Sequence, residues 1–135
     1  FGHKVYKKII IKDDLDLIKK TISDLTNDTK IDAIITTGGT GLTGRDSTPE
    51  AIIEMADKII DGFGELFRQL SYEKIGTSTI QSRALAGVIN NTYIFSLPGS
   101  PGACKDGWDL ILKYQLDIRH KPCNFIEIMP RLKEK

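Results

Sequence analysis

Strand-like and helix-like patterns of apolar residues alternate along the first part of the chain. Residues 5–11 are rich in β-branched side chains and predict a strand. After Asp13 and Asp14, apolar residues recur with the spacing of one helix face: Leu15, Ile18, Ile22 and Leu25. Residues 31–37 form a short apolar run, which is typical of a strand buried on both faces. The chain is therefore predicted to begin as strand, helix, strand.

A second helix is predicted to begin near Ser47. Ser47 and Glu50 have the spacing of a capping box, in which each side chain bonds to a free backbone N–H group of the first turn. The apolar stripe of this helix comprises Ile52, Met55 and Ile59. Gly62 and Gly64 are expected to end the helix before a separate helical stretch at residues 65–72.

The last third of the chain adds a hairpin, a helix and a strand, while residues 77–87 are not assigned. Residues 88–89 and 93–97 flank two asparagines, which tolerate the left-handed conformation of a tight turn. The loop 98–102 precedes a helix whose apolar face comprises Trp108, Ile111, Leu112 and Ile118. Residues 125–129 predict a final short strand. This alternation predicts one α/β domain over residues 1–135, with a mostly parallel sheet covered on both faces.

Composition adds constraints on partners and compartment. The 135 residues include 19 Lys and Arg against 18 Asp and Glu, and this net charge of +1 does not favour a nucleic-acid partner. No apolar run approaches the ~20 residues of a membrane helix, so no membrane partner is expected. Cys104 and Cys123 lack C-x-x-C spacing and are expected to be free thiols in a reducing cytoplasm.

The strongest local signal for chemistry is a glycine-rich loop at residues 38–44, directly after the predicted strand 31–37. Ligands of open α/β sheets bind at the carboxyl ends of strands, and backbone N–H groups of glycines can approach an anion closely. Phosphate is the expected ligand, with a plain tight turn as the alternative. Gly39, Gly41 and Gly44 fit G-x-G-x-x-G, but the next helix begins too late for a dinucleotide-binding motif.

Two carboxylates beside this loop are candidate magnesium ligands. Asp46 follows the loop, and a carboxylate next to a bound phosphate is repelled unless a Mg²⁺ ion lies between them. Asp13 follows the predicted strand 5–11 and is expected at the same edge of the sheet, where the two could hold one ion that bridges nucleotide phosphates. A helix N-cap is the alternative for each aspartate, and a solvated loop charge is a further one for Asp46.

A second loop of similar chemistry, residues 98–102, also follows a strand and precedes a helix. Proline fixes its shape, and glycine opens its backbone to a ligand. Ser82 and Arg83 lie between the two loops in the sequence. The planar fork of an arginine suits phosphate, and a surface ion pair is the alternative for Arg83.

Longer stretches of the sequence resemble one known family. TTGGTGLTGRDSTPEAI at 36–52 resembles the signature of the MoaB/Mog domain of molybdenum cofactor biosynthesis. GFGELFRQLSYEKIGTS, QSRALAG and LPGSPGACKDGWD, which begin at residues 62, 81 and 97, look like MoaB-type bacterial members. The resemblance extends over essentially the whole chain and implies a three-layer α/β/α domain. The family pattern begins with a strand, a loop and a helix that are absent before Phe1, so we expect a longer native polypeptide.

The resemblance also implies a function. Mog-type members transfer AMP from Mg-ATP to molybdopterin, and the alternative is a molybdopterin-binding or carrier protein without turnover. Asp13 and Asp46 match the family's two functional aspartates. The residues implied to contact nucleotide phosphates are Thr37, Gly38, Gly39, Thr40 and Gly41. Those implied to line the molybdopterin site are Ser82, Arg83, Pro98, Gly99, Ser100 and Pro101.

Family assembly implies a homo-oligomer, either a trimer or a hexamer, and contacts with other proteins of the molybdenum cofactor pathway. Residues 62–72 are the candidate contact segment between copies. Their apolar stripe could equally belong to the core, and it comprises Phe63, Leu66, Phe67 and Leu70.

Overall fold

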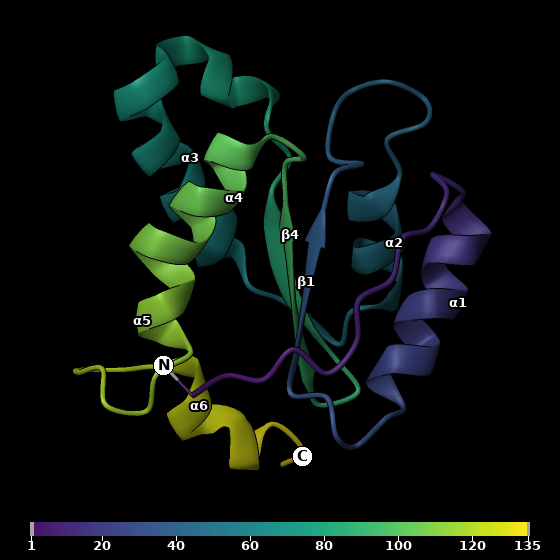
Figure 1. The fold of residues 1–135 in the computed structure, drawn as a ribbon, viewed down its shortest axis with the longest axis vertical. Helices are drawn as coiled ribbons and strands as arrows, with labels where there is room; N and C mark the ends of the chain where they lie inside the picture. Colours follow the sequence, from purple (N-terminus) through teal and green to yellow (C-terminus); the bar gives the residue numbers. More distant parts are fainter. Residues whose placement is uncertain (1, 135) are drawn as a thin grey trace.

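The computed structural model describes residues 2–134, and a four-stranded sheet lies at its centre (Figure 1). The strands are β1 (Ala33–Thr37), β2 (Lys58–Ile59), β3 (Leu85–Ile89) and β4 (Thr92–Leu97), in the order β1-β4-β3-β2. β1 pairs with β4 in parallel, whereas β4 with β3 and β3 with β2 are antiparallel. The sheet is therefore mixed rather than mostly parallel.

The predicted hairpin explains why the sheet is mixed. Asn90 and Asn91 join β3 to β4 with φ of 49° and 67°, the left-handed conformation that a tight two-residue hairpin turn requires. A connection this short can join only antiparallel strands. The hairpin is thus confirmed, and it sets the direction of one central pair.

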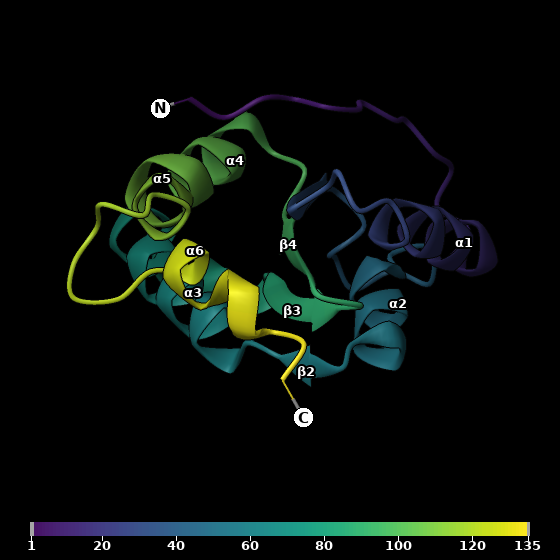
Figure 2. The ribbon, with the colours of Figure 1, turned by 90° about the horizontal axis from the view of Figure 1, so that it is seen from below.

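Helices cover both faces of the sheet, which confirms the three-layer organisation (Figure 2). α1 (Leu15–Thr26) and α2 (Thr48–Met55) lie on one face, and α3 (Asp61–Ile75), α4 (Pro101–Gly107), α5 (Lys113–Gln115) and α6 (Phe125–Ile128) on the other. Each face has its own apolar cluster. The cluster beneath α1 and α2 comprises Ile18, Ile22, Ile34, Ala51, Ile52, Ile89 and Ile94. The cluster beneath the other helices is centred on Phe63, Phe67, Tyr93, Phe95, Leu97 and Leu112.

The first two helices begin where their sequence signals indicate, but only one is capped as expected. Asp14 caps α1, since its Oδ1 accepts a hydrogen bond from the Leu17 N–H at 2.8 Å. The Ser47 side chain makes no cap bond to α2. The predicted capping box is therefore wrong, because the Glu50 carboxylate is bonded instead to Arg83.

α3 runs without interruption through Gly62 and Gly64, so the prediction that these glycines end a helix is wrong. Gly64 faces the backbone of Ala84, where an added Cβ would lie 2.6 Å from the Ala84 carbonyl oxygen. The glycine thus allows a close approach of helix and chain. β2 separates α2 from α3, which places Ile59 in an edge strand rather than on the stripe of α2. α3 continues into a 3₁₀ helix, η1 (Gly76–Gln81), in the unassigned region.

The C-terminal third is helical. α4, a π-helical turn η2 (Trp108–Leu112) and α5 follow one another directly, and Ile118 lies beyond them. The strand predicted at 125–129 is wrong, because α6 and a 3₁₀ turn η3 (Met129–Arg131) occupy this segment. The buried Asn124 caps α6 by accepting a hydrogen bond from the Glu127 N–H at 2.8 Å, which overrides the local strand pattern.

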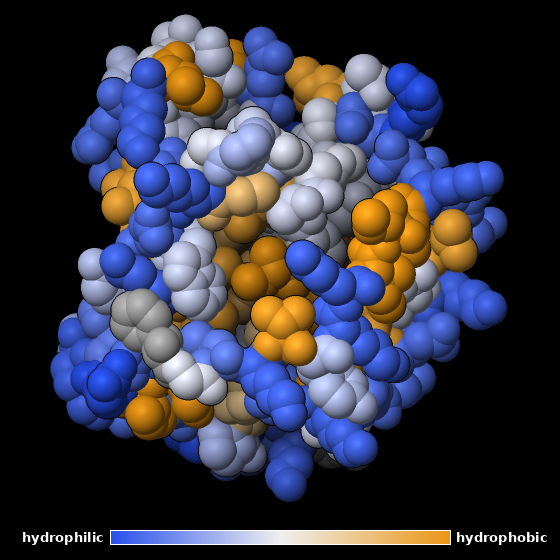
Figure 3. Space-filling view, in the orientation of Figure 1, coloured by the Kyte–Doolittle hydropathy of each residue, from blue (hydrophilic) through white to orange (hydrophobic). Residues whose placement is uncertain are grey.

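The strand predicted at residues 5–11 is also wrong, because residues 2–12 form an extended segment outside the sheet (Figure 2). This segment passes from His3, whose ring contacts Trp108, across to α1. Apolar side chains gather on this face of the molecule, and Ile10 is fully exposed (Figure 3). A β pattern gives a strand only where a neighbouring strand pairs with it. None of the helices in residues 2–134 is long and apolar enough to cross a membrane.

Candidate functional site at the carboxyl ends of β1 and β4

A cleft of about 460 Å³ lies at the edge of the sheet where β1 and β4 end, and residues of the glycine-rich loop and of α3 line it. Nine of the residues predicted from the sequence line it: Gly38, Gly39, Thr40, Gly41, Asp46, Ser82, Pro98, Gly99 and Ser100. The rest of the lining comprises Phe67, Ser71, Ile75, Gln81 and Ala103. The structure therefore gathers residues from five separate stretches of the chain around one hollow.

The parallel pairing of β1 with β4 brings the two predicted loops together. Both strands end at the same edge of the sheet, and the Gly38 N–H donates to the Leu97 carbonyl at 3.0 Å. An added Cβ on Gly99 would lie 3.3 Å from the Gly38 Cα, so the loops pack backbone against backbone. Gly38 and Gly39 have φ of 91° and 69°, a conformation that other residues rarely adopt. The first glycines thus turn the chain sharply at the cleft.

Asp46 presents an ionised carboxylate to the cleft. Its Oδ2 accepts hydrogen bonds from the Thr43 hydroxyl at 2.7 Å and the Thr43 N–H at 3.0 Å. These bonds, the hydroxyl first, lower the pKa of Asp46, and the Gly41 N–H contributes in the same direction. The carboxylate also lies against Gly41, where an added Cβ would be 2.7 Å from Oδ2. The glycine loop therefore carries a fixed negative charge beside its backbone.

Asp13 lies beside the same loop but does not line the cleft. Its Oδ1 is 3.7 Å from the position that a Cβ on Gly39 would take. Asp14 caps α1, so the N-cap alternative belongs to Asp14 rather than Asp13. Residues 2–134 contain no group of three or more His, Cys, Asp and Glu that could hold a metal ion by themselves. Proteins commonly bind Mg²⁺ with one or two carboxylates and complete its shell with substrate phosphates and water, and Asp46 with Asp13 fits that donor set.

Arg83 is turned toward the glycine loop rather than the cleft. Its Nε donates to the Gly41 carbonyl at 2.8 Å and to the Thr40 carbonyl at 3.3 Å, and Nη2 donates to the Asp46 carbonyl at 2.8 Å. Nη1 pairs with the carboxylate of Glu50, and this bond lowers the pKa of Glu50. The ion pair proposed as the alternative for Arg83 is present, together with three bonds to loop carbonyls.

The remaining predicted residues are divided between the cleft wall and supporting positions. Ser82 lines the cleft, and its Oγ accepts a bond of 3.4 Å from the Ala84 N–H. Ser100 lines it as well, and its Oγ accepts a bond of 3.2 Å from the Ala103 N–H at the start of α4. Thr37 ends β1 and Pro101 begins α4, and neither lines the cleft.

The wall that α3 supplies was missed by sequence reasoning. Phe67, Ser71 and Ile75 follow one another at intervals of four residues, so one face of α3 borders the cleft. The available signal was Ser71, a small polar residue on a helix stripe that is otherwise apolar, and it is buried in the structure. The candidate contact stripe at 62–72 is mostly core, because Phe63 and Phe67 are buried.

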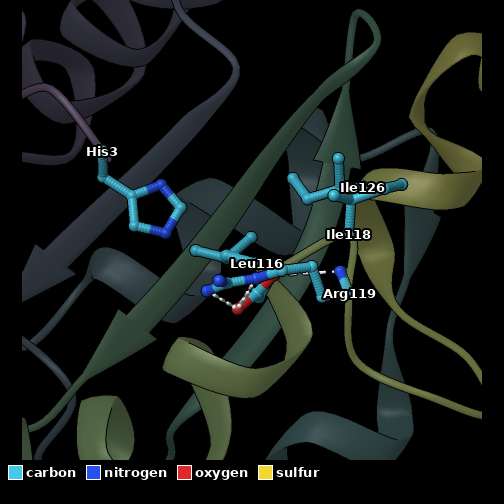
Figure 4. Close-up of a pocket in the computed structure, with 6 residues that line it drawn as sticks. His3, Leu116, Ile118, Arg119 and Ile126 are labelled. Atoms are coloured by element: carbon cyan, nitrogen blue, oxygen red, sulfur yellow. Dashed lines mark hydrogen bonds and ion pairs between the residues drawn. The ribbon is translucent and has the colours of Figure 1, made fainter. Parts of the chain in front are cut away.

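A second hollow, of about 400 Å³, is lined by His3 and by residues between 116 and 126 (Figure 4). Its charged groups neutralise each other, because the Arg119 guanidinium bonds both oxygens of Asp117 and holds the pKa of that carboxyl at about 2. The rest of the lining comprises His3, Leu116, Ile118 and Ile126. These six residues include no glycine, and their one carboxylate is paired with Arg119, whereas the first cleft combines four glycines with the Asp46 carboxylate; the first cleft is therefore the candidate site.

Comparisons with known proteins agree with the motifs. The model of a family described as "probable molybdopterin binding domain" matches residues 1–118. Molybdenum cofactor biosynthesis protein B of Escherichia coli K12 is 48% identical over 124 residues, covering 92% of this chain and 73% of that protein.

Two solved structures support the fold assignment. A crystal structure of molybdenum cofactor biosynthesis protein B has a TM-score of 0.82 at 42% identity and covers 85% of this chain and 72% of that one. The structure of the molybdopterin biosynthesis enzyme MoaB from Thermus thermophilus has a TM-score of 0.67 at 38% identity. It covers 75% of this chain and 63% of that one.

Proposed function

We infer a function on the premise that this chain belongs to the MoaB/Mog family of molybdenum cofactor biosynthesis, a family of probable molybdopterin binding domains. We propose that it binds molybdopterin and Mg-ATP in the cleft and transfers AMP to the terminal phosphate of molybdopterin. We also propose that this activity takes place in the cytoplasm.

The observation that carries this proposal is the glycine loop with an ionised carboxylate beside it. Gly38 and Gly39 turn the backbone at positive φ at the carboxyl end of β1, where N–H groups can face an anion. Asp46 would repel a phosphate bound there unless a cation lies between them. Backbone N–H groups and a carboxylate at one place therefore favour a magnesium-bound nucleotide over a simple anion.

The proposed transfer needs positioning and neutralisation of charge rather than a strong base. A terminal phosphate oxygen of molybdopterin would form a bond to the α-phosphorus of ATP while the bond to the bridging oxygen of the β-phosphate breaks, so that pyrophosphate leaves. The attacking oxygen is already anionic and loses no proton. The loop residues that line the cleft, Gly38, Gly39, Thr40 and Gly41, would hold the nucleotide phosphates in line for attack.

Asp46 and Asp13 would hold the magnesium ion, which neutralises charge on the phosphates. Molybdopterin would lie against the opposite wall. Ser82 offers a hydroxyl there, and the exposed Ile75 offers apolar surface to a flat ring system. Pro98, Gly99 and Ser100 also line the cleft and would contact the bound molybdopterin.

A carrier or binding protein without turnover is the second candidate. It is favoured by the position of Asp13, which does not line the cleft and leaves Asp46 as the one carboxylate on its wall among residues 2–134. Both candidates require molybdopterin to bind, so only product formation separates them.

The test measures pyrophosphate release from Mg-ATP and molybdopterin by the wild type and by Asp46→Asn, with molybdopterin affinity measured separately. We expect the variant to lose about 100-fold or more in turnover and to keep its molybdopterin affinity. Asp24→Asn, at an exposed position of α1, is the matched control and should behave as the wild type. Full turnover in Asp46→Asn would refute the role of that carboxylate. A wild type that binds molybdopterin but releases no pyrophosphate would be a carrier.

We also propose that copies of the chain assemble as a trimer or a hexamer. Leu66 and Tyr72 of the candidate segment remain exposed, as does Ile75 at the end of α3. Light scattering should give the mass of an oligomer, and the mass of a monomer would refute this proposal.

A further inference from the structure

The glycine loop is held from one side by a single side chain. Arg83 bonds the carbonyls of Thr40 and Gly41 in the loop and that of Asp46 just after it, and so joins the two ends of the turn that these residues span. All three guanidinium nitrogens are occupied, because Nη1 is paired with Glu50. These bonds use three of its five N–H groups and turn the guanidinium toward the loop, and Arg83 is not among the residues that line the cleft.

The carbonyl bonds fix the direction of the loop's peptide groups. In a trans peptide the C=O and N–H groups point in opposite directions. When Arg83 holds the carbonyl of Thr40, the N–H of Gly41 must therefore point away from Arg83, and it donates to the Asp46 carboxylate. The bond to the Gly41 carbonyl fixes the N–H of Leu42 in the same manner. Arg83 thus decides which way the donors of the loop face.

The backbone on either side of Arg83 is bonded by a second arginine. Arg68 of α3 donates through Nη1 to the Ala84 carbonyl at 2.9 Å and the Ser82 carbonyl at 3.4 Å, on either side of Arg83. The Arg68 carbonyl accepts a bond of 3.0 Å from the Thr79 hydroxyl. The bonds of Arg68 to the chain around Arg83, and those of Arg83 to the glycine loop, therefore connect α3 to this loop.

We propose that Arg83 is a positioning residue that sets the glycine loop in its anion-binding conformation and does not itself bind the substrate phosphates. The effect on turnover rests on the proposed function, whereas the effect on the loop does not. A lysine at this position would keep the positive charge but lose the fork that reaches three carbonyls and a carboxylate together. Arg83→Lys therefore separates positioning by the fork from attraction by the charge.

The experiment compares hydrogen–deuterium exchange of residues 38–47 in the wild type, Arg83→Lys and Arg83→Ala, without any ligand. We expect exchange in this segment to rise about tenfold in both variants, because neither lysine nor alanine can bond the three carbonyls and Glu50 together. Arg119→Lys is the matched control: it makes the same substitution at an arginine forked onto Asp117, and it should leave the segment unchanged. Wild-type exchange in Arg83→Lys would overturn the proposal.

Kinetics supply a second readout on the same variants. If the wild type releases pyrophosphate, Arg83→Lys should raise the KM for ATP about tenfold despite its retained charge, and a KM unchanged from the wild type would overturn the proposal. If the wild type releases none, the proposed activity fails and the exchange experiment still decides the role of Arg83. Should both Arg83 variants unfold, Glu50→Gln replaces them. About threefold faster exchange in the loop would then support the proposal, and unchanged exchange would overturn it.

Discussion

Replacing Gly39 with alanine should destabilise the protein for two separable reasons. The backbone of Gly39 has φ of 69°, which costs a residue with a Cβ about 1–2 kcal/mol. The new Cβ would also lie 2.3 Å from Oγ1 and 3.3 Å from Cβ of Thr48. Rotation of the Thr48 hydroxyl removes only the first contact, so the loop and the buried start of α2 must move apart.

The structure sets the size of this effect. Separation of the loop from α2 strains the bond of 3.2 Å from the Thr48 N–H to the Gly39 carbonyl, which contributes about 1 kcal/mol. With the backbone strain, the expected loss in free energy of unfolding is about 2–3 kcal/mol. Urea denaturation followed by the fluorescence of Trp108, the one tryptophan of the chain, measures this loss as a shift in midpoint.

Alanine substitutions at two other glycines of the loop distinguish the cost of backbone strain from the cost of steric overlap with Thr48. Gly38 has φ of 91° but open space around its missing Cβ, so Gly38→Ala should cost only the backbone strain of about 1–2 kcal/mol. Gly44 has open space and no positive φ, so Gly44→Ala should change stability by less than about 0.5 kcal/mol. Equal losses for Gly38→Ala and Gly39→Ala would refute the argument from the Thr48 contact.

Three further predictions concern named contacts elsewhere. Carbon-detected NMR should give Asp117 a pKa of about 2, and Arg119→Ala should raise this pKa toward 3.8. An unchanged pKa in the variant would contradict the role of the Arg119 bonds to both oxygens of Asp117. Asn124→Ala removes the cap of α6 and should lower the free energy of unfolding by about 1–2 kcal/mol in urea, whereas an unchanged midpoint would contradict the capping role. The bond to Arg83 lowers the pKa of Glu50 in the folded state below its ordinary value of 4.5. The ion pair therefore contributes its full stabilisation above pH 4.5, and this contribution is lost as the pH falls through the folded-state pKa. The difference in unfolding free energy between wild type and Glu50→Gln should therefore shrink on acidification, and a constant difference would refute the linkage.

Elements specified by local signals were predictable from the sequence. The spacing of apolar residues and Asp14 locate α1, and two adjacent asparagines locate the β3–β4 turn. The glycine loop lies where the sequence placed it, at the end of β1. The motifs that resemble the MoaB/Mog family are confirmed by the matching family model and by the relatives.

Features that depend on distant neighbours were not predictable in the same way. Residues 5–11 have a strand composition without a paired strand, and Asn124 turns a strand-like sequence into α6. Gly64 looks like a helix breaker, but its place opposite Ala84 gives it a packing role inside α3. The sequence indicated Arg83 as an anion-binding candidate, while its orientation is set by loop carbonyls distant in the sequence.

Direct detection of the product tests the central claim, that the cleft beside the glycine loop transfers AMP to molybdopterin. The protein is incubated with molybdopterin and Mg-ATP labelled at the α-phosphate, and the pterin fraction is analysed for label and mass. The account predicts labelled, adenylylated molybdopterin together with an equal amount of pyrophosphate, both lost in Asp46→Asn. Molybdopterin that is bound but remains unlabelled, with ATP intact, would contradict it.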